Sequence, residues 1–292
     1  MFGGSMVALV TPMKSDGALD FEALERLIEF HVDAGTRALV VAGTTGESPT
    51  LETDEHADLI GEAVRLSAGR VPVIAGTGSN STAQTLHLTR KVEAMGVDGF
   101  LLVVPYYNKP SQEGLYRHFS TVARAVEKPV VLYNVPGRTS CDLLPETVAR
   151  LAELDTVVGL KEATGDMQRL QALRELCGDE IELYSGDDAT AMDFILGGGI
   201  GDVSVTANVA PEQMQALCDA ARSGDREKAA EINNRLMPLH RELFVECNPV
   251  PVKWALAEMG LIQPGIRLPL VPLAEEHHER VRAALRHAGI LD

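Results

Sequence analysis

Residues 157–164 read VVGLKEAT, a short apolar run of the kind that forms a buried strand, with a lysine inside it. An unpaired ammonium group is expensive to bury, so Lys161 must reach the surface, pair with an acid or take part in chemistry. A lysine in such a run is more often an edge or snorkelling residue than a nucleophile. The rest of the sequence has to decide between these roles.

The run at 157–164 is one of eight similar runs, and amphipathic stretches such as 21–34 and 54–68 separate them. Apolar strands that alternate with helices predict a parallel sheet covered on its faces. Eight units over about 220 residues favour a closed (β/α)8 barrel, the TIM barrel, over an open sheet. A doubly wound sheet is the alternative, but no GxGxxG turn follows the first run. The other runs are SMVALVTP (5–12), ALVVAGTTG (38–46), VPVIAGTG (71–78), GFLLVVPYY (99–107), PVVLYNVP (129–136), IELYSGDD (181–188) and GDVSVTANV (201–209).

After Arg222 the pattern becomes helical only, over 225–246, about 251–259 and 274–288. The segment NPVP and several prolines between 264 and 272 interrupt these stretches. We therefore expect two domains: a catalytic barrel over 1–224 and a C-terminal helical domain over 225–292. The helix over 54–68 is expected to begin at a Thr53 cap.

Composition and charge narrow the possible partners. The chain of 292 residues has a formal net charge of −16, which argues against nucleic acid or an anionic membrane as a partner. Its four cysteines form no CxxC or Cys/His cluster, so we expect reduced thiols in a cytoplasmic protein. No stretch approaches 18 uninterrupted apolar residues, and the apolar start lacks the basic segment of a signal peptide.

Polar residues gather where the predicted strands end. In a barrel enzyme the C-terminal ends of the strands carry the chemistry, and the opposite face serves stability. A tyrosine at one strand end most often packs, so each residue alone is weak evidence, and their convergence on one rim is the signal. The residues concerned are the turn 43–47, Tyr106, Tyr107, Tyr133, Asn134, Arg138, Lys161 and the segment 185–188.

A lysine sheltered by apolar walls is favoured as the neutral amine, which can attack a ketone and form a Schiff base. The resulting iminium stabilises a neighbouring carbanion, so no metal or other cofactor is required. Hydroxyls of Tyr133, Thr44 and Tyr107 can relay protons, each step being helped by about 10²–10⁴-fold. The Thr45 hydroxyl and the backbone amides of the turn 43–46 suit the carboxylate of an α-keto acid.

Six segments carry a closer resemblance, which extends from Met6 to Leu291. On them the chain resembles the dihydrodipicolinate synthase family of pyruvate-dependent class I aldolases and lyases, which includes N-acetylneuraminate lyase. The turn GTTGE and the strand lysine mark the whole family, and YNVPGRT is more specific to the synthase branch. The segments are GTTGE (43–47), YNVPGRT (133–139), GLKEATGD (159–166), SGDDAT (185–190), SVTANVAP (204–211) and NPVPVKWA (248–255).

The resemblance implies condensation of pyruvate with L-aspartate 4-semialdehyde in the diaminopimelate route to L-lysine. Lys161 would form the Schiff base, and Arg138 would bind the carboxylate of the aldehyde substrate through two parallel hydrogen bonds. The family also implies a homotetramer, a dimer of tight dimers, in which Tyr107 reaches the neighbouring subunit's site. The remaining implied roles are proton relay for Tyr133, Thr44 and Tyr107, pyruvate binding for Thr45, and the pocket border for Gly186 and Val203.

Many family members are inhibited by L-lysine at the dimer interface. Four positions of this chain match that site: Ser48, His56, Asn80 and Tyr106. Thr53 and Gln84 depart from the sensitive pattern, which commonly has His and Glu there. Losing the glutamate removes a charge-assisted contact typically worth about 1.5–3 kcal/mol, so we expect weakened or absent inhibition. A helix-face histidine without a ligand is the alternative interpretation of His56.

Two other functions are compatible with the same lysine. One is a pyruvate-dependent lyase acting on N-acetylneuraminate or a 2-keto-3-deoxy sugar acid, against which Arg138 after VPG argues. The other is a non-catalytic barrel that senses pyruvate or lysine, which would have little use for the full lysine, tyrosine and threonine set.

Four further features of the sequence are expected to be structural. GGGIGD (197–202) precedes the eighth run and should face the stability end of the barrel. GTGSN (76–80) should be a turn that is structural or part of a subunit interface. Lys253 should pack or form an ion pair, and Asp187 and Asp188 should hydrogen-bond their own loop.

Overall fold

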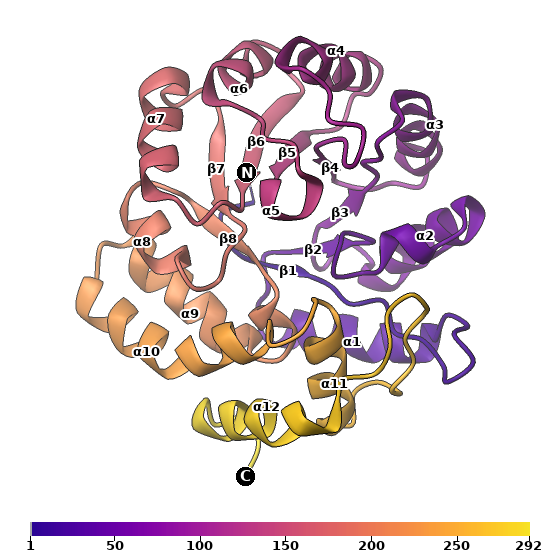
Figure 1. Ribbon diagram of the computed structural model, residues 1–292, viewed down its shortest axis with the longest axis vertical. Coiled ribbons are helices and arrows are strands. Elements are labelled where there is room, and N and C mark those ends of the chain that lie inside the picture. The colour runs from indigo at the N-terminus through magenta and orange to yellow at the C-terminus, as the bar shows by residue number, and fades with distance from the viewer. Residues whose placement is uncertain (1) are drawn as a thin grey trace.

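Eight parallel strands close into a barrel in the computed structural model, which describes residues 2–292 (Figure 1). Each strand pairs with its neighbours in chain order, and β1 closes the ring by pairing with β8. The prediction of a (β/α)8 barrel is confirmed, with every predicted strand present. The strands are β1 (Gly4–Ala8), β2 (Ala38–Val41), β3 (Val73–Gly76), β4 (Gly99–Val103), β5 (Val130–Asn134), β6 (Val157–Glu162), β7 (Glu182–Ser185) and β8 (Gly201–Ser204).

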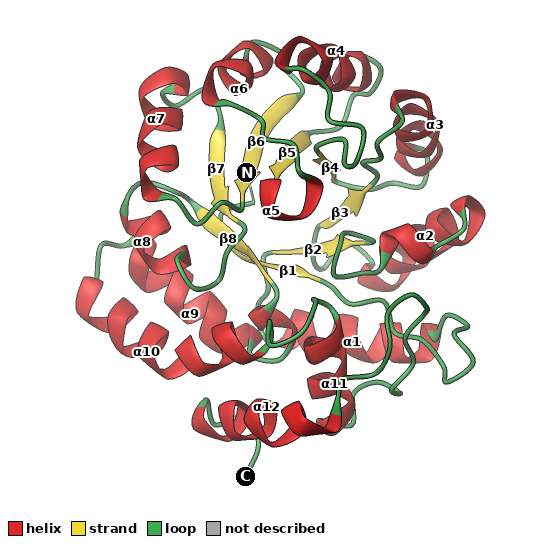
Figure 2. Cartoon of the chain, viewed as in Figure 1, coloured by secondary structure: helices red, strands yellow, loops and turns green. Residues whose placement is uncertain are grey.

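A ring of helices surrounds the strands (Figure 2). The first of them shows why these segments are helical: the buried residues Ala23, Leu24, Leu27 and Ile28 recur at helical spacing, and the Asp20 carboxylate caps the start. The helices are α1 (Phe21–Asp33), α2 (Thr53–Ser67), α3 (Thr82–Glu93), α4 (Gln112–Ala123), α5 (Pro136–Thr139), α6 (Pro145–Ala152), α7 (Met167–Cys177), α8 (Ala191–Leu196), α9 (Pro211–Arg222), α10 (Arg226–Glu242), α11 (Val250–Glu258) and α12 (Glu275–His287), with 3₁₀ turns at Ser48–Thr50 and Thr206–Asn208.

The alternation of side chains along each strand divides the core into two layers. On β2, Ala38 and Val40 belong to the apolar cluster inside the barrel, whereas Leu39 and Val41 belong to the larger cluster between the strands and the helices. Both faces of each strand are therefore buried, which explains why the strands read as continuous apolar runs.

The glycines before β8 lie at the end of the barrel where the strands begin. Gly201 pairs with Gly4, and a Cβ atom on Gly201 would lie 2.3 Å from the Gly4 carbonyl oxygen. This contact confirms that GGGIGD is a packing feature at the stability face. GTGSN follows β3, as expected of a turn, although Gly78 and Ser79 also line a cavity described below.

Helices α10, α11 and α12 lie together below the barrel in the view of Figure 1. α10 packs against α8, α9 and α12, and α11 packs against α12. Their bounds agree with the predicted helical stretches to within a few residues. The division of the chain into two domains at residue 224 stays a prediction. Across residues 2–292 no helix has the length and apolar character needed to cross a membrane.

Candidate active site at the barrel mouth

Lys161 lies on β6 with only 5% of its surface exposed. The strand register pairs it with Tyr133 on β5 and with Tyr184 on β7. Its Nζ atom is 4.3 Å from the centroid of the Tyr133 ring, which belongs to the apolar cluster inside the barrel. Lys161 therefore does not snorkel to the surface. Its Nζ atom faces an aromatic ring in the barrel interior.

The stem of Lys161 needs a glycine on the neighbouring strand end. A Cβ atom on Gly186 would lie 2.7 Å from Lys161 Cε, closer than two carbon atoms can approach. Val203, on β8, is 2% exposed and belongs to the same interior cluster as Tyr133. The structure thus brings Lys161, Tyr133 and Gly186 together, and Val203 lies in the interior cluster that includes Tyr133.

The residue after Lys161 has a different task. Glu162 accepts hydrogen bonds from the Asn134 side-chain amide at 3.1 Å and from the Thr164 backbone amide at 2.8 Å. Burial raises the pKa of Glu162, although these hydrogen bonds oppose the change. Asn134 and Glu162 are register partners, as are Tyr133 and Lys161. The hydrogen bond between Asn134 and Glu162 therefore helps to hold the strand register that places Lys161 opposite Tyr133. This role of Glu162 was not predicted from the sequence.

The turn 43–47 after β2 forms the next part of the rim. Gly46 is required there, because a Cβ atom would lie 3.0 Å from Ala42 Cα and 3.1 Å from Thr11 Oγ1. The Thr11 hydroxyl donates to the Gly46 carbonyl at 2.6 Å, which fixes the turn to the segment that follows β1. Thr45 is 3% exposed, and Thr44 lines the cavity beside it.

Glu47 ends this turn in the left-handed backbone region, with φ of 54°. Its buried carboxylate forms an ion pair with Lys253 of α11 and accepts a hydrogen bond from the Arg267 backbone amide at 3.2 Å. Burial lowers the pKa of Lys253, against the attraction of Glu47. The prediction that Lys253 forms an ion pair is confirmed. Its partner is the glutamate of the GTTGE motif, which the sequence alone did not reveal.

Asn248 joins two of the predicted site residues. Its side-chain amide donates to the Thr45 hydroxyl at 2.9 Å, and its backbone carbonyl accepts from Arg138 Nη2 at 3.3 Å. Arg138 Nη1 also lies 3.7 Å from the Cys247 sulfur. Asn248 belongs to the segment NPVPVKWA, but its role was not predicted from the sequence. The sequence feature that could have identified Asn248 is its place as a polar residue between two helical stretches.

Tyr107 does not approach Lys161 within its own chain. Strand β4 ends at Val103, so Tyr106 and Tyr107 lie in the loop that follows and not on the strand. Tyr107 has a φ of 75° and is 87% exposed, the largest exposure of any large apolar or aromatic side chain among the described residues. Its neighbour Tyr106 turns into a cavity instead.

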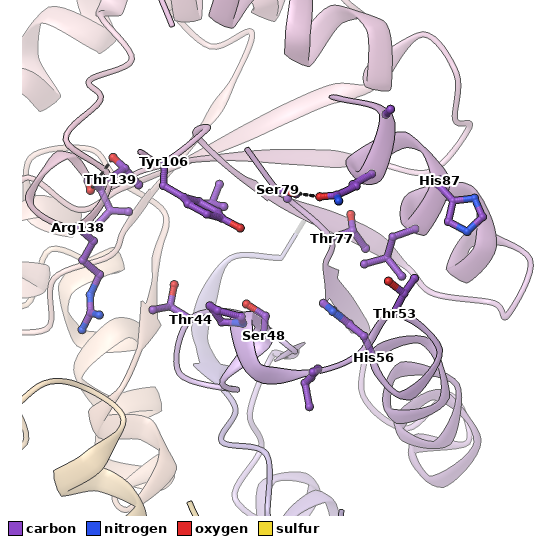
Figure 3. A pocket seen from close by; sticks show the side chains of 18 residues that line it. Thr44, Ser48, Thr53, His56, Thr77, Ser79, His87, Tyr106, Arg138 and Thr139 are labelled. Carbon is purple, nitrogen blue, oxygen red and sulfur yellow. Dashed lines mark hydrogen bonds between the residues drawn. The ribbon is translucent and has the colours of Figure 1, made fainter. Parts of the chain in front are cut away.

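That cavity, of about 620 Å³, extends from the barrel mouth along α2 and α3 (Figure 3). Arg138, Thr44 and Tyr106 lie towards one end of the view, and His56 and His87 towards the other. Of the four residues matched to a lysine site, Ser48, His56 and Tyr106 line the cavity. Asn80 does not line it, and its backbone carbonyl accepts from Asn108.

His56 is held by the fold itself. Its Nε2 atom lies 2.8 Å from the Gly76 carbonyl oxygen, and burial lowers the pKa of the ring. Nε2 therefore carries the proton and donates to that carbonyl. Thr53 and Gln84, which depart from the lysine-sensitive pattern, also line the cavity. Ser79 donates to Gln84 Oε1 at 3.1 Å.

The paired aspartates after β7 hydrogen-bond their surroundings. Asp188 accepts from the backbone amides of Val205 and Thr206, both at 3.0 Å, and from the Ser204 hydroxyl. Asp187 accepts from the Thr190 hydroxyl at 2.7 Å. The prediction that the pair hydrogen-bonds its own loop is confirmed for Asp187, whereas Asp188 accepts from residues at and just after the end of β8.

The sequence profile of the Dihydrodipicolinate synthetase family matches residues 1–288. The chain belongs to this family. Its similarity to the 4-hydroxy-tetrahydrodipicolinate synthase of Alcanivorax borkumensis is 60% identity over 292 residues, covering 100% of this chain and 99% of the relative. The family resemblance drawn from the six segments is thereby confirmed.

Solved structures of the family superpose closely on this chain. The chloride-inhibited dihydrodipicolinate synthase from Acinetobacter baumannii, complexed with pyruvate, has a TM-score of 0.98 and 51% identity, with 100% of both chains covered. The enzyme from Cyanidioschyzon merolae with lysine bound has a TM-score of 0.96 and 40% identity, with 99% of each chain covered. Family membership and identity at this level make the chain an enzyme of lyase type.

Proposed function

We propose that the chain acts as a 4-hydroxy-tetrahydrodipicolinate synthase, condensing pyruvate with L-aspartate 4-semialdehyde in the diaminopimelate route to L-lysine. The observation that carries this proposal is the buried Lys161, which lies against Tyr133 and directly over Gly186. Relatives that bear the name of this synthase support the choice of reaction.

The proposed reaction begins when the neutral amine of Lys161 attacks the ketone carbon of pyruvate. Loss of water gives an iminium, and loss of a methyl proton then gives an enamine. The enamine carbon attacks the aldehyde, whose oxygen takes up a proton. The amino group of the second substrate then displaces Lys161, which closes the ring and frees the enzyme. No metal or other cofactor takes part in these steps.

Each proton in this sequence needs a carrier near Lys161. We assign the relay to Tyr133, Thr44 and Tyr107, the last from a neighbouring subunit. Thr45 holds the pyruvate carboxylate, while Gly186 and Val203 border the pocket. Tyr133 supports this assignment through its contact with Lys161, and Thr44 through its place on the cavity wall.

Assays with two substrates test the reaction. Purified protein should consume aspartate semialdehyde together with pyruvate and should leave N-acetylneuraminate intact. Cleavage of N-acetylneuraminate or of a 2-keto-3-deoxy sugar acid, without condensation, would favour the alternative lyase. The position of Arg138 at the cavity supports the short substrate with its own carboxylate.

Arg138→Ala is expected to raise the KM for aspartate semialdehyde by about 10- to 100-fold, since hydrogen bonds to a charged group contribute about 1.5–3 kcal/mol. Steady-state kinetics with each substrate varied in turn measures the change, and the KM for pyruvate should move much less. Arg150→Ala is the control, because Arg150 is half-exposed and pairs with Glu113 on the surface. Unchanged aldehyde kinetics in the Arg138 variant would remove this assignment.

The cavity at α2 and α3 is proposed to take L-lysine weakly. Gln84→Glu is expected to lower the lysine concentration for half-inhibition by about tenfold or more, because the new carboxylate would pair with the ligand's ammonium group. Inhibition curves at fixed substrate measure this. Gln168→Glu, which adds the same charge at the exposed start of α7, should have no effect. An equal response of both variants would contradict a lysine site at Gln84.

We also propose a homotetramer, a dimer of dimers, in the cytoplasm. The exposed ring of Tyr107 supports the assembly, because it lies free on the chain surface where a second subunit can receive it. Light scattering that gave the mass of a single 31.4 kDa chain under assay conditions would contradict the assembly.

A further inference from the structure

We propose that Asn248, which lies between the C-terminal helices α10 and α11, is a positioning residue for pyruvate. Its side chain orients the Thr45 hydroxyl so that the hydroxyl proton is available to the substrate carboxylate. This inference rests on the proposed function, in which Thr45 holds that carboxylate.

The contact is buried and direct. Asn248 is 5% exposed and Thr45 is 3% exposed, and Asn248 Nδ2 lies 2.9 Å from Thr45 Oγ1. The two residues are 203 positions apart in the sequence. The connection between α10 and α11 therefore contributes a side chain that contacts the rim of the barrel.

The direction of this hydrogen bond determines what Thr45 can do. A hydroxyl group has one proton to donate and two lone pairs that accept. Because the Asn248 amide nitrogen can only donate, it occupies one lone pair of Thr45 and leaves the hydroxyl proton for another partner. A carboxylate accepts that proton well, since charged acceptors form the stronger hydrogen bonds.

The side-chain oxygen and the backbone carbonyl of Asn248 have different surroundings. Its Oδ1 atom is buried and has no hydrogen-bond partner among residues 2–292. The Asn248 backbone carbonyl meanwhile accepts from Arg138, so one residue contacts both side chains assigned to substrate carboxylates.

A second contact fixes the relative position of the two segments. Lys253, one turn into α11, pairs with Glu47 at the end of the turn that contains Thr45. The side chains of both partners are at most 4% exposed. Asn248 and Thr45 are thus held at their hydrogen-bonding distance by a neighbouring buried pair, as positioning residues require.

Trapping with pyruvate and sodium borohydride tests the inference without the aldehyde substrate. The measured quantity is the pyruvate concentration that gives half of the maximal adduct, read by intact mass. Asn248→Ala should raise it by about three- to tenfold, the usual effect of one hydrogen bond. Asn248→Asp should raise it more than tenfold, because a carboxylate would accept the Thr45 proton and repel pyruvate. Asn233→Ala is the control: it replaces a buried asparagine of α10 and should leave this pyruvate concentration unchanged.

A double-mutant cycle separates positioning from general disruption. In the Thr45→Val background the hydroxyl is gone, so Asn248→Ala should have no further effect on half-saturation. A full effect of Asn248→Ala in that background, or no effect in the parent, would overturn the inference. If the parent protein formed no adduct at all, this result would contradict the proposed function, and the inference that rests on it would fail for that reason.

Discussion

Lys161→Ala is expected to abolish the borohydride-trapped adduct with pyruvate and to lower kcat for condensation on the order of 10⁴-fold or more. Lys161 supplies the amine that bonds to the substrate carbon, and alanine has no group that replaces it. Intact mass measures the adduct, and a peptide map locates it. The mass added to the parent protein should lie on the peptide that contains β6.

Lys253 makes the mapping informative. It is the other buried lysine of residues 2–292, at 3% exposure, but Glu47 engages its ammonium group. An adduct on the Lys253 peptide, or an adduct that survives in the Lys161→Ala protein, would contradict the assignment of the nucleophile. Lys228→Ala is the control, because Lys228 is an exposed residue of α10 and should leave both adduct and turnover intact.

Lys253→Met is expected to lower the free energy of unfolding by about 3–5 kcal/mol, because removing one partner of a buried ion pair leaves the other charge without compensation. The Glu47 carboxylate would remain buried, with the Arg267 backbone amide as its remaining donor. Equilibrium urea unfolding, followed by circular dichroism, measures the difference.

The double variant Glu47→Gln/Lys253→Met separates charge burial from lost packing. A neutral amide at position 47 removes the uncompensated charge, so the double variant should recover most of the stability lost in Lys253→Met. Equal instability of the two proteins would contradict this explanation. Lys91→Met breaks the exposed Lys91–Asp54 pair by the same substitution and should have no measurable effect.

The barrel could be predicted from the sequence because its signal is local and repeated. Each strand is buried on both faces, so each appears as a continuous apolar run between helical stretches. The first and last residues of individual helices and strands were predicted less accurately than the elements themselves. Helix α2 begins at Thr53, and its cap is Glu52, whose capping box with Glu55 replaces the expected Thr53 cap. The run at 99–107 overestimated β4, since only Gly99–Val103 forms the strand.

The part of the site that lies on strand ends was predictable for the same reason. Lys161 and Tyr133 are the last residues but one of β6 and β5, and Gly186 follows β7; the parallel barrel brings such positions to one rim. The contacts of Asn248 and Lys253 were not predictable. Each joins residues more than 200 positions apart, and no periodic pattern within either segment specifies its partner.

The distance along the chain between these partners has a consequence for synthesis. Asn248 and Lys253, the residues that fix the turn containing Thr45, are translated about 200 residues after that turn. A growing polypeptide can therefore form most of the barrel strands on the ribosome while its pocket is still incomplete. Catalytic competence should appear only after α11 has left the exit tunnel and docked.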